Sequence, residues 1–400
     1  MKILMLCDFF NENLEYQENL LVKYYIKHGH QVTIITSTFD SVFDYYSDRH
    51  NKSWPSRTYR CEGATVIKLQ YKFNILNRLR AFSQIKKILN SEAPDLIFVH
   101  DIMLNFPECV SYIKSHPDCR MIMDYHADYS NSGKNAISLK ILHGLIRKSF
   151  LDRARPYLSR IFPIVPAGAI FLNEIYDIPH SEMELLPLGA DTDFAREIRE
   201  SNSRDKLRNR FGVAKDDIVI FTGGKLTPAK RTELLLKAVD SIQGHTLHVV
   251  VVGDASDDHS NYKQELQRLA VANSRVHMVG WLGRREIYEH LAMSDLAVFP
   301  ASQSILWQQA IAMALPLIAG DTGHQDISYL NLEDNIIVLP AEKITAPDLA
   351  EAIASVVGNP ERLRRMSEGA SVVSNEHLNW DRLVARTLRF NVSASAQRGS

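Results

Sequence analysis

Adjacent glycines and nearby lysines follow one apolar run in the second half of the chain, and together they could bind a diphosphate. The run DIVIFTGG ends at Gly223 and Gly224, and Lys225, Lys230 and Arg231 come next, before a helical pattern. Adjacent glycines let a ligand approach the backbone closely, and cations beside a helix N-terminus attract phosphate oxygens. The alternative is a solvated basic turn. A P-loop is excluded, because the motif G-x-x-x-x-G-K-[ST] does not occur.

Two histidines stand at the ends of apolar runs in the first half. His100 closes DLIFVH, and His126 closes RMIMDYH. A histidine at a strand end can donate a hydrogen bond, act as a general acid or base, or stabilise developing charge. Because the chain has 15 histidines, a structural role for either one stays open.

The stretch LWQQAIAMALPLIAG is apolar except for Gln308 and Gln309. We expect a short helix over residues 305–314, capped by Ser302 or Ser304 and preceding another strand. The free N–H groups at its start would attract an anion, and Gln309 could hydrogen-bond a neutral polyol such as a ribose. In the alternative, both glutamines only satisfy neighbouring backbone.

Asp191 and Asp193 form a D-x-D pair, which in another context could hold a divalent metal. Such pairs are frequent by chance, and this one lies in a glycine-punctuated segment between the two halves. We therefore expect a structural role for the pair and no metal site.

Two segments of the first half, 71–90 and 137–162, combine cations with large apolar side chains. The first has five lysines and arginines and no acid, and the second has six against the single acid Asp152. This composition suits contact with an anionic membrane surface. The alternative is a pair of ordinary surface helices with long basic side chains.

Length and composition predict the number of domains and limit the kinds of partner. A chain of 400 residues predicts two domains, and its net charge of −1 gives no general attraction to nucleic acid. We expect no signal peptide, because the apolar run at the start is short and meets charge at Asp8, and no membrane-spanning helix, because no run of about 18 apolar residues occurs. The four cysteines form no C-x-x-C pair, so we expect a reducing cytoplasm, with peripheral membrane contact left open.

Apolar runs alternate with helical patterns along the whole chain. In the first half the runs are KILMLC, QVTIITS, ATVIKL, DLIFVH and RMIMDYH, and in the second DIVIFTGG, HVVVVGD, VHMVG, LAVFPAS and PLIAG. Continuous apolar strands between helices predict parallel sheets covered on both faces. We therefore expect an α/β protein with two doubly wound, Rossmann-like domains facing across a cleft, residues 1–186 and 187–375, and a segment 376–400 that packs back on the first domain.

Taken together, these motifs resemble the retaining glycosyltransferases of the GT-B fold, specifically the family 4 type. The second half carries most of the resemblance, in GGKLTPAKRTELLLKAV, VVVVGD, VHMVGWLGRREIYEHLAMSDLAVFPAS and QAIAMALPLIAGDTGHQD. LPLGAD is similar to the loop that opens the family's second domain. In the first half, KHGHQVTIITS and MDYHAD resemble family segments.

The resemblance implies a nucleotide-sugar donor, no metal or other cofactor, and a role for each residue. Lys225 and Lys230 would bind the donor diphosphate, His126 would lie near the reacting sugar, and the loop at 280–282 would contact the base. Retention is thought to proceed by front-face attack through an oxocarbenium-like state. The implied catalytic residues are His126 and Lys230, and the implied donor-binding residues are Gly224, Lys225, Lys230, Gly280, Trp281, Leu282, Gln303, Ser304, Ile305, Leu306 and Gln309.

Three positions depart from the family pattern. The family usually has two glutamates around the short helix, but the second aligns with Gln309 and the first with Ala301, or with Gln303 if the loop shifts. The glycine loop after the first strand is replaced by FFNENLEYQEN, and a family glycine is Ala314. A glutamine keeps the capacity to hydrogen-bond while removing a charge that would oppose a diphosphate.

Glu15 or Glu18 could supply a polar contact from the first domain instead. The leading hypothesis is a glycosyltransferase that acts on a glycan or lipid-linked acceptor of surface polysaccharide or glycoconjugate synthesis. The alternatives are a non-catalytic nucleotide-sugar-binding partner subunit and a GT-B-like sugar epimerase.

Overall fold

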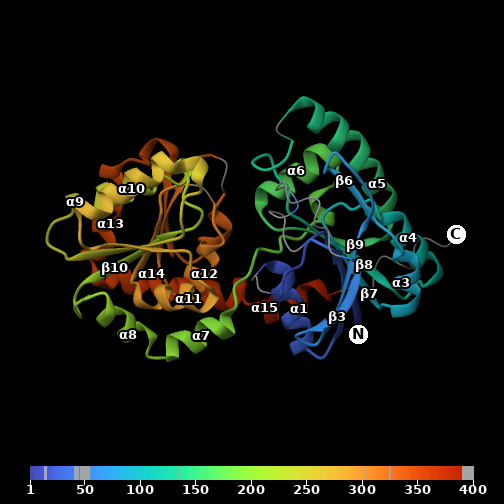
Figure 1. Cartoon of the computed structure of the whole chain (residues 1–400), viewed down its shortest axis with the longest axis horizontal. Coiled ribbons are helices and arrows are strands. Elements are labelled where there is room, and N and C mark those ends of the chain that lie inside the picture. The colour runs from blue at the N-terminus through green and yellow to red at the C-terminus, as the bar shows by residue number, and fades with distance from the viewer. Residues whose placement is uncertain are drawn as a thin grey trace. The chain divides into compact units, whose positions relative to one another are not determined.

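The computed structural model describes two compact units of the chain. One comprises Met1–Pro187 with the helix α15 (Trp380–Thr387), and the other comprises Leu188–Asn379 (Figure 1). The residues described are 1–12, 16–39, 45, 55–133, 135–301, 303–323 and 326–389, with the side chain of Asp257 left out. Glu15 and Ser302, both named above as candidates, lie outside this set.

The first unit is built on a seven-stranded sheet in the order β3-β4-β2-β1-β7-β8-β9, parallel except for the edge pair β3–β4. Its strands are nearly continuous apolar runs because helices cover both faces. Leu4 and Leu6 of β1 pack with α3 to α6 on one face, and Ile3 and Met5 pack with α1 and α15 on the other. The strands are β1 (Lys2–Leu6), β2 (Gln31–Ser37), β3 (Arg57–Cys61), β4 (Ala64–Leu69), β7 (Leu96–His100), β8 (Arg120–Tyr125) and β9 (Leu158–Pro163).

Helices of this unit follow the strands in the order expected of a doubly wound fold. They are α1 (Gln17–Lys27), α3 (Ile85–Glu92), α4 (Phe106–Ser115), the π-helix η2 (Ser138–Arg147), which continues into α5 (Lys148–Ala154), and α6 (Pro166–Tyr176). The last helix, α15, packs on α1 through the Tyr25–Thr387 hydroxyl pair at 2.5 Å and the Lys27–Asp381 ion pair at 2.8 Å.

The second unit is a six-stranded parallel sheet in the order β12-β11-β10-β13-β14-β15. Helices α9, α10 and α13 cover one face, and α7, α8, α11, α12 and α14 cover the other (Figure 1). The strands are β10 (Ile218–Gly223), β11 (Leu247–Val252), β12 (Val276–Gly280), β13 (Leu296–Phe299), β14 (Leu317–Asp321) and β15 (Ile336–Pro340). The helices are α7 (Thr192–Glu200), α8 (Ser203–Arg210), α9 (Thr232–Ser241), α10 (Ser260–Ala272), α11 (Arg284–Met293), α12 (Leu306–Ala312), α13 (Ala346–Val357) and α14 (Pro360–Val373).

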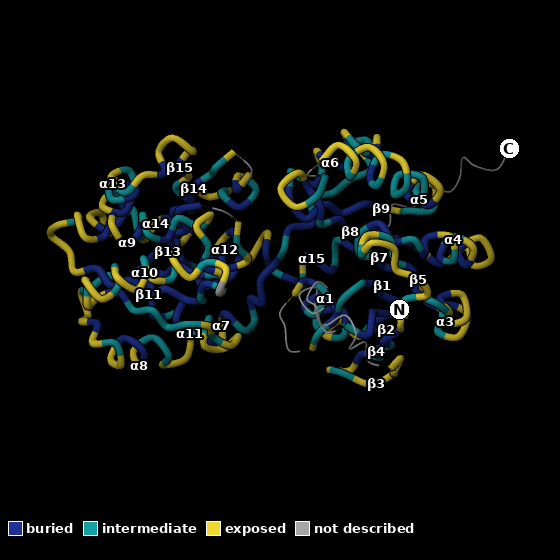
Figure 2. The backbone as a smooth tube through the Cα atoms, turned by 45° about the horizontal axis from the view of Figure 1, so that its top comes forward, coloured by how far each residue is buried: buried dark blue, intermediate teal, exposed yellow. Residues whose placement is uncertain are grey.

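The predicted fold class, two doubly wound α/β sheets, is confirmed. The strands β3, β9 and β15 were not predicted. Polar residues interrupt β3 and β9, whereas β15 is a short apolar run, IIVLP, whose burial is mixed along the strand. Figure 2 shows that the tube is buried along most sheet strands and exposed around the hairpin strand β5. No helix in the described part of the chain is long and apolar enough to cross a membrane.

The alternative interpretation of 71–90 and 137–162, as ordinary surface helices, was wrong for part of each segment. Residues 71–82 form a β-hairpin, β5 (Tyr71–Ile75) and β6 (Leu79–Phe82). Leu76 and Asn77 both take φ above +50° in the three-residue turn between the paired Ile75 and Leu79, and the Arg78 N–H donates to the Ile75 carbonyl at 3.0 Å. Beyond residue 157 the second segment enters the sheet as β9.

Candidate functional site

Three glycines bring the carboxyl ends of β10, β11 and β12 into close contact. The N–H of Gly224 donates to the carbonyl of Val252 at 2.9 Å, and the N–H of Gly253 donates to the carbonyl of Gly280 at 2.7 Å. A Cβ on Gly253 would collide with the carbonyl oxygen of Gly224, and Gly253 has φ +103°. Glycine is therefore required here, and a ligand can reach the bare backbone of these loops.

Lys230 reaches over this glycine loop from the short 3₁₀ turn η5 (Pro228–Lys230). Its Nζ donates to the carbonyl oxygen of Gln303 at 2.8 Å, and a Cβ on Gly224 would lie 3.7 Å from its Cε. Burial lowers the pKa of the Lys230 ammonium to about 8. At neutral pH the group remains mostly protonated, so a poorly hydrated cation is held beside the glycine loop. Lys225, by contrast, is exposed.

The loop before α12 forms the opposite wall around Gly224. A Cβ on Gly224 would lie 3.6 Å from the Ser304 Oγ, which accepts a hydrogen bond from the Leu306 N–H at 3.3 Å. Of the two serines proposed as caps, Ser304 thus bonds an amide at the start of the helix. Ile305 is exposed and Leu306 is buried. The helix α12 is shorter than predicted and ends before Ala314, which takes φ +59°.

Gln308 and Gln309, both buried, make different contacts. With its amide oriented to suit its neighbours, Gln308 donates to the carbonyls of Ser304 and Ile305 and accepts from the Tyr329 hydroxyl, each at 3.2 Å. Gln309 Oε1 is buried and has no hydrogen-bond partner among the described residues. Gln308 therefore satisfies local structure, whereas Gln309 keeps an acceptor to offer, which costs free energy unless a ligand donates to it.

The loop after β12 places the other predicted donor residues. Gly280 ends the strand with φ +74°, and Trp281 follows with 65% of its surface exposed. Leu282 packs on the core below, and the Gly283 N–H donates to Glu286 at 2.9 Å, which starts α11. Trp281 therefore presents an exposed indole directly after Gly280, whose carbonyl accepts from the Gly253 N–H, and such an indole is suited to stacking with a flat ring.

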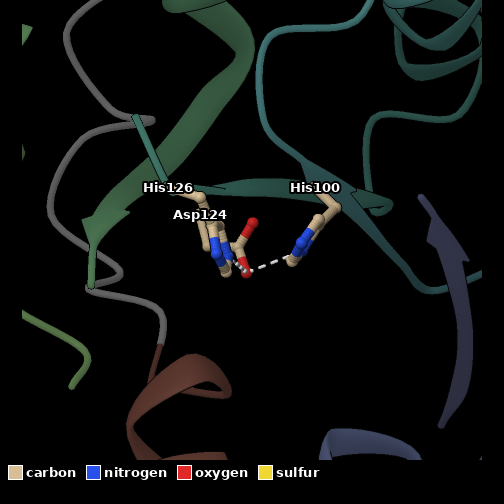
Figure 3. Close-up of side chains that lie close together, drawn as sticks. All are labelled: His100, Asp124 and His126. Carbon is tan, nitrogen blue, oxygen red and sulfur yellow. Dashed lines mark hydrogen bonds and ion pairs between the residues drawn. The ribbon is translucent and has the colours of Figure 1, made fainter. Parts of the chain in front are cut away.

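A second cluster lies in the first unit, at the ends of β7 and β8. Asp124 Oδ2 lies 2.9 Å from His100 Nδ1 and 3.2 Å from His126 Nε2 (Figure 3). His100 Nε2 lies 3.0 Å from Glu18 of α1. The His126 N–H donates to Asp101 at 2.9 Å, which fixes the backbone beyond the strand. The His126 side chain keeps 24% of its surface exposed, more than the other groups of the cluster.

Charges in this cluster are arranged to keep His100 protonated. Burial alone lowers the pKa of His100, but the carboxylates of Asp124 and Glu18 more than offset this and hold it well above 6.5. Burial likewise raises the pKa of both carboxyls, but the histidines outweigh it and leave each pKa below its usual value. His100 is thus a buried cation between two anions, and Asp124 is a fixed acceptor for His126.

His100, Asp124 and His126 also have the composition of a metal site, with potential ligand atoms within 4.8 Å of one another. A metal ligand must offer a lone pair, whereas the carboxylates on either side of His100 raise its pKa and favour the protonated imidazole, which has none. The arrangement is therefore better described as an ion-pair network that orients His126.

Asp191 and Asp193 have structural roles. Asp191 is fully buried, caps α7 by accepting from the Phe194 N–H at 3.2 Å, and pairs with Arg284. Asp193 pairs with Arg196 at 2.9 Å. The D-x-D motif thus fixes the entry to the second unit, as expected.

Asp124 was not singled out from the sequence, although the pattern could have revealed it. Side chains alternate along a strand, so Asp124 and His126 point to one side of β8, and His100 is the register partner of Asp124 on β7. Asp8, just after β1, was also missed. It pairs with Arg80 and accepts from the Tyr71 hydroxyl at 2.8 Å.

Two family sequence profiles match successive parts of the chain. Residues 19–194 match the profile described as Glycosyltransferase Family 4, and residues 216–359 match Glycosyl transferases group 1. Together they cover most of the chain, and the residues between them, 195–215, belong to the second unit.

Among curated proteins, the chain is 23% identical over 236 residues to the lipopolysaccharide 1,2-N-acetylglucosaminetransferase of Salmonella typhimurium, covering 56% of this chain and 60% of that protein. It is 25% identical over 220 residues to a D-inositol 3-phosphate glycosyltransferase of Rhodococcus erythropolis, covering 52% and 48%. The chain thus spans about half the length of the curated relatives that it matches.

Solved structures share the fold over nearly the whole chain. A glycosyltransferase from Rickettsia africae superposes with a TM-score of 0.69 at 15% identity, covering 97% of this chain and 96% of that one. The Anabaena protein HepE, in complex with UDP, gives 0.68 at 16% identity, covering 97% and 99%.

Proposed function

The chain belongs to the GT-B glycosyltransferases of the family 4 type, and on that premise we propose that it transfers a sugar from a nucleotide-diphosphate sugar to a glycan or lipid-linked acceptor. The acceptor class fits surface-glycan synthesis, as in the lipopolysaccharide enzyme that it resembles. The observation that carries the proposal is the partly buried Lys230 ammonium, which lies beside the bare backbone of Gly224 and donates to the Gln303 carbonyl at 2.8 Å.

Lys230 would act on the leaving group. When the bond between the sugar and the phosphate breaks, negative charge grows on the diphosphate, and a partly buried cation already in place stabilises it without reorganisation. Lys225 is placed to add a second, more hydrated cation. The lysines can supply the charge that a metal supplies in other transferases, so we propose that the reaction needs no metal.

Gln309 and Trp281 would bind the nucleoside. The buried Oε1 of Gln309 can accept from a ribose hydroxyl, which satisfies an acceptor that has no partner among the described residues. Trp281 offers its exposed ring to the base. A neutral glutamine in place of the usual family glutamate adds no charge repulsion toward the diphosphate.

His126 would serve the reacting sugar from the first unit. Its Nε2 is held by Asp124, and its partly exposed ring can contact a sugar hydroxyl or the developing positive charge. We propose retention of configuration through front-face attack, in which the departing diphosphate and not an enzyme carboxylate assists the acceptor. The four cysteines are free thiols, which suits the cytoplasm as the place of reaction.

The test is a panel of nucleotide sugars, each incubated with the protein and with candidate acceptors, followed by measurement of released nucleoside diphosphate and of transferred sugar. Lys230→Met and His126→Ala should each abolish transfer. Lys206→Met, which removes an exposed lysine of α8, should leave transfer unchanged.

The alternatives give distinct results. Binding of a donor without any turnover identifies a non-catalytic partner subunit, and conversion of the donor with no acceptor present identifies an epimerase. The substitution of the family glutamate by Gln309 is the feature that favours these alternatives. Neither binding nor turnover with any common donor would refute the proposed function.

A further inference from the structure

The helix formed by η2 exposes a row of large apolar side chains on the first unit. Ile137, Ile141 and Leu145 are 73%, 50% and 65% exposed, and their spacing of four residues places them along one side of the helix. The opposite side packs inward, where His143 is buried and bonded to the Tyr176 hydroxyl at 2.7 Å. The exposed row is therefore the outer face of an otherwise well-packed element.

The β5–β6 hairpin exposes a second group of apolar side chains. Phe73, Ile75 and Leu76 are 38%, 53% and 88% exposed. Leu76 sits at the tip with φ +52°, a backbone conformation that leucine adopts only at a cost and that glycine or asparagine adopts readily. An exposed leucine in a strained conformation at a turn tip does not stabilise the fold. This indicates that Leu76 contacts something outside the molecule.

The hairpin and the helix adjoin one another. The Arg147 guanidinium, two residues beyond Leu145, donates to the carbonyl of Arg78, two residues beyond Leu76, at 3.3 Å. Six of the sixteen large apolar side chains exposed in the described residues thus belong to these two neighbouring elements. Such clustering exceeds the scattered exposure that is ordinary on a protein surface.

The charge around this apolar group is positive. Neither 71–82 nor 136–148 contains an acidic residue. Lys72 and Lys140 are exposed and have no acidic partner among the described residues, whereas Arg80 is paired with Asp8. Lys72 on β5 and Lys140 on η2 therefore remain as cations from the predicted segments, and they lie on the same two elements as the exposed apolar side chains.

We propose that the β5–β6 hairpin and the exposed face of η2 form a docking surface for an anionic lipid bilayer. Leu76, Ile141 and Leu145 insert at the level of the headgroups, and Lys72 and Lys140 pair with lipid phosphates. Exposed apolar side chains and the exposed Lys72 and Lys140, on two segments that contain no acidic residue, complement such a surface in both charge and polarity. The surface shares no residue with the groups assigned to the donor, so binding to lipid and donor turnover can be measured separately.

The experiment is flotation of the whole protein, without donor, with vesicles of phosphatidylcholine alone or containing about 30% phosphatidylglycerol. Wild type should float with the anionic vesicles at low salt and be released at about 0.5 M salt. Leu76→Gly and Ile141→Ser should each weaken binding about tenfold, the loss expected for one apolar side chain withdrawn from the interface. Val271→Ser, which removes an 87% exposed side chain from α10, is the matched control and should bind like wild type.

Leu76→Gly separates docking from folding, because glycine relieves the strain at the tip and should leave the melting temperature unchanged or raised. Loss of flotation together with an intact melting temperature supports the docking surface. The proposal is overturned if wild type ignores anionic vesicles, if binding is indifferent to lipid charge and salt, or if Leu76→Gly binds as tightly as Val271→Ser. It is also overturned if the protein forms a dimer that Leu76→Gly dissociates, since a second copy would then cover this surface.

Discussion

Replacing Lys230 by methionine should make the protein more stable and inactive at the same time. Burial moves the pKa of Lys230 from 10.5 to about 8, so holding its charge in the folded state at pH 7 costs about 3 kcal/mol. Methionine keeps the aliphatic stem and removes that cost. It also loses the hydrogen bond to the Gln303 carbonyl, worth about 1 kcal/mol, so we expect a net gain of about 2 kcal/mol.

The sign of the effect depends on pH. The folded state gives up the Lys230 proton more readily than the unfolded state does. The cost is therefore fully present below pH 8 and disappears as the pH rises to 10.5. Wild type and Lys230→Met should differ most in urea midpoint at pH 7 and converge toward pH 10.

Lys230→Met should lower activity although it raises stability. A desolvated cation that contacts a donor phosphate contributes about 2–5 kcal/mol when its partner is bound, which corresponds to a fall in kcat/KM of about 30-fold to about 5,000-fold. Urea unfolding at pH 7 and about pH 10, alongside donor turnover, measures both parts. An unchanged midpoint at pH 7 would contradict the desolvated state of Lys230, and turnover like that of wild type would contradict its role at the diphosphate.

Three further predictions follow from neighbouring contacts. Gln309→Ala should raise the KM for the donor about fivefold or more with little change in stability, whereas Gln308→Ala should lower stability by about 1–3 kcal/mol, because it leaves buried groups unpaired; enzyme kinetics and urea unfolding of both variants decide this. Gly253→Ala should prevent folding of the second unit or destabilise it by several kcal/mol, whereas Gly212→Ala, with open space around it, should cost about 1 kcal/mol; equal urea midpoints would contradict the close crossing. Asp124→Asn should destabilise the first unit by about 3 kcal/mol, because a buried imidazolium loses a partner, and a midpoint equal to that of wild type would show that the network carries no charge.

The sequence predicted the sheets better than it predicted the surface elements. Continuous apolar runs such as HVVVV become strands buried on both faces, since nothing but a covered sheet accommodates them. The hairpin at 71–82 escaped prediction, because its turn uses Leu76 and Asn77 in a left-handed conformation where the usual signal is Asn-Gly.

For the candidate site too, the sequence predicted some features and not others. Gly224 and Lys230 lie on the loop after β10 and Ser304 lies on the loop after β13, and strand ends at one edge of a sheet explain why these two loops meet. The sequence could not show that Lys230 is desolvated or that Gln309, unlike Gln308, keeps an unpaired acceptor, because both depend on packing around each atom. Asp124 was hidden by its place inside an apolar strand, where a buried carboxylate is tolerated only through its histidine partners.

We propose that loops of the second unit bind a nucleoside diphosphate. Native mass spectrometry of the whole protein with a panel of nucleoside diphosphates tests this binding most directly. We predict one added nucleotide mass on wild type for at least one base, retained by His126→Ala, because that residue lies in the first unit, and lost by Lys230→Met. Absence of any adduct, or an adduct that Lys230→Met retains at wild-type strength, would contradict the account.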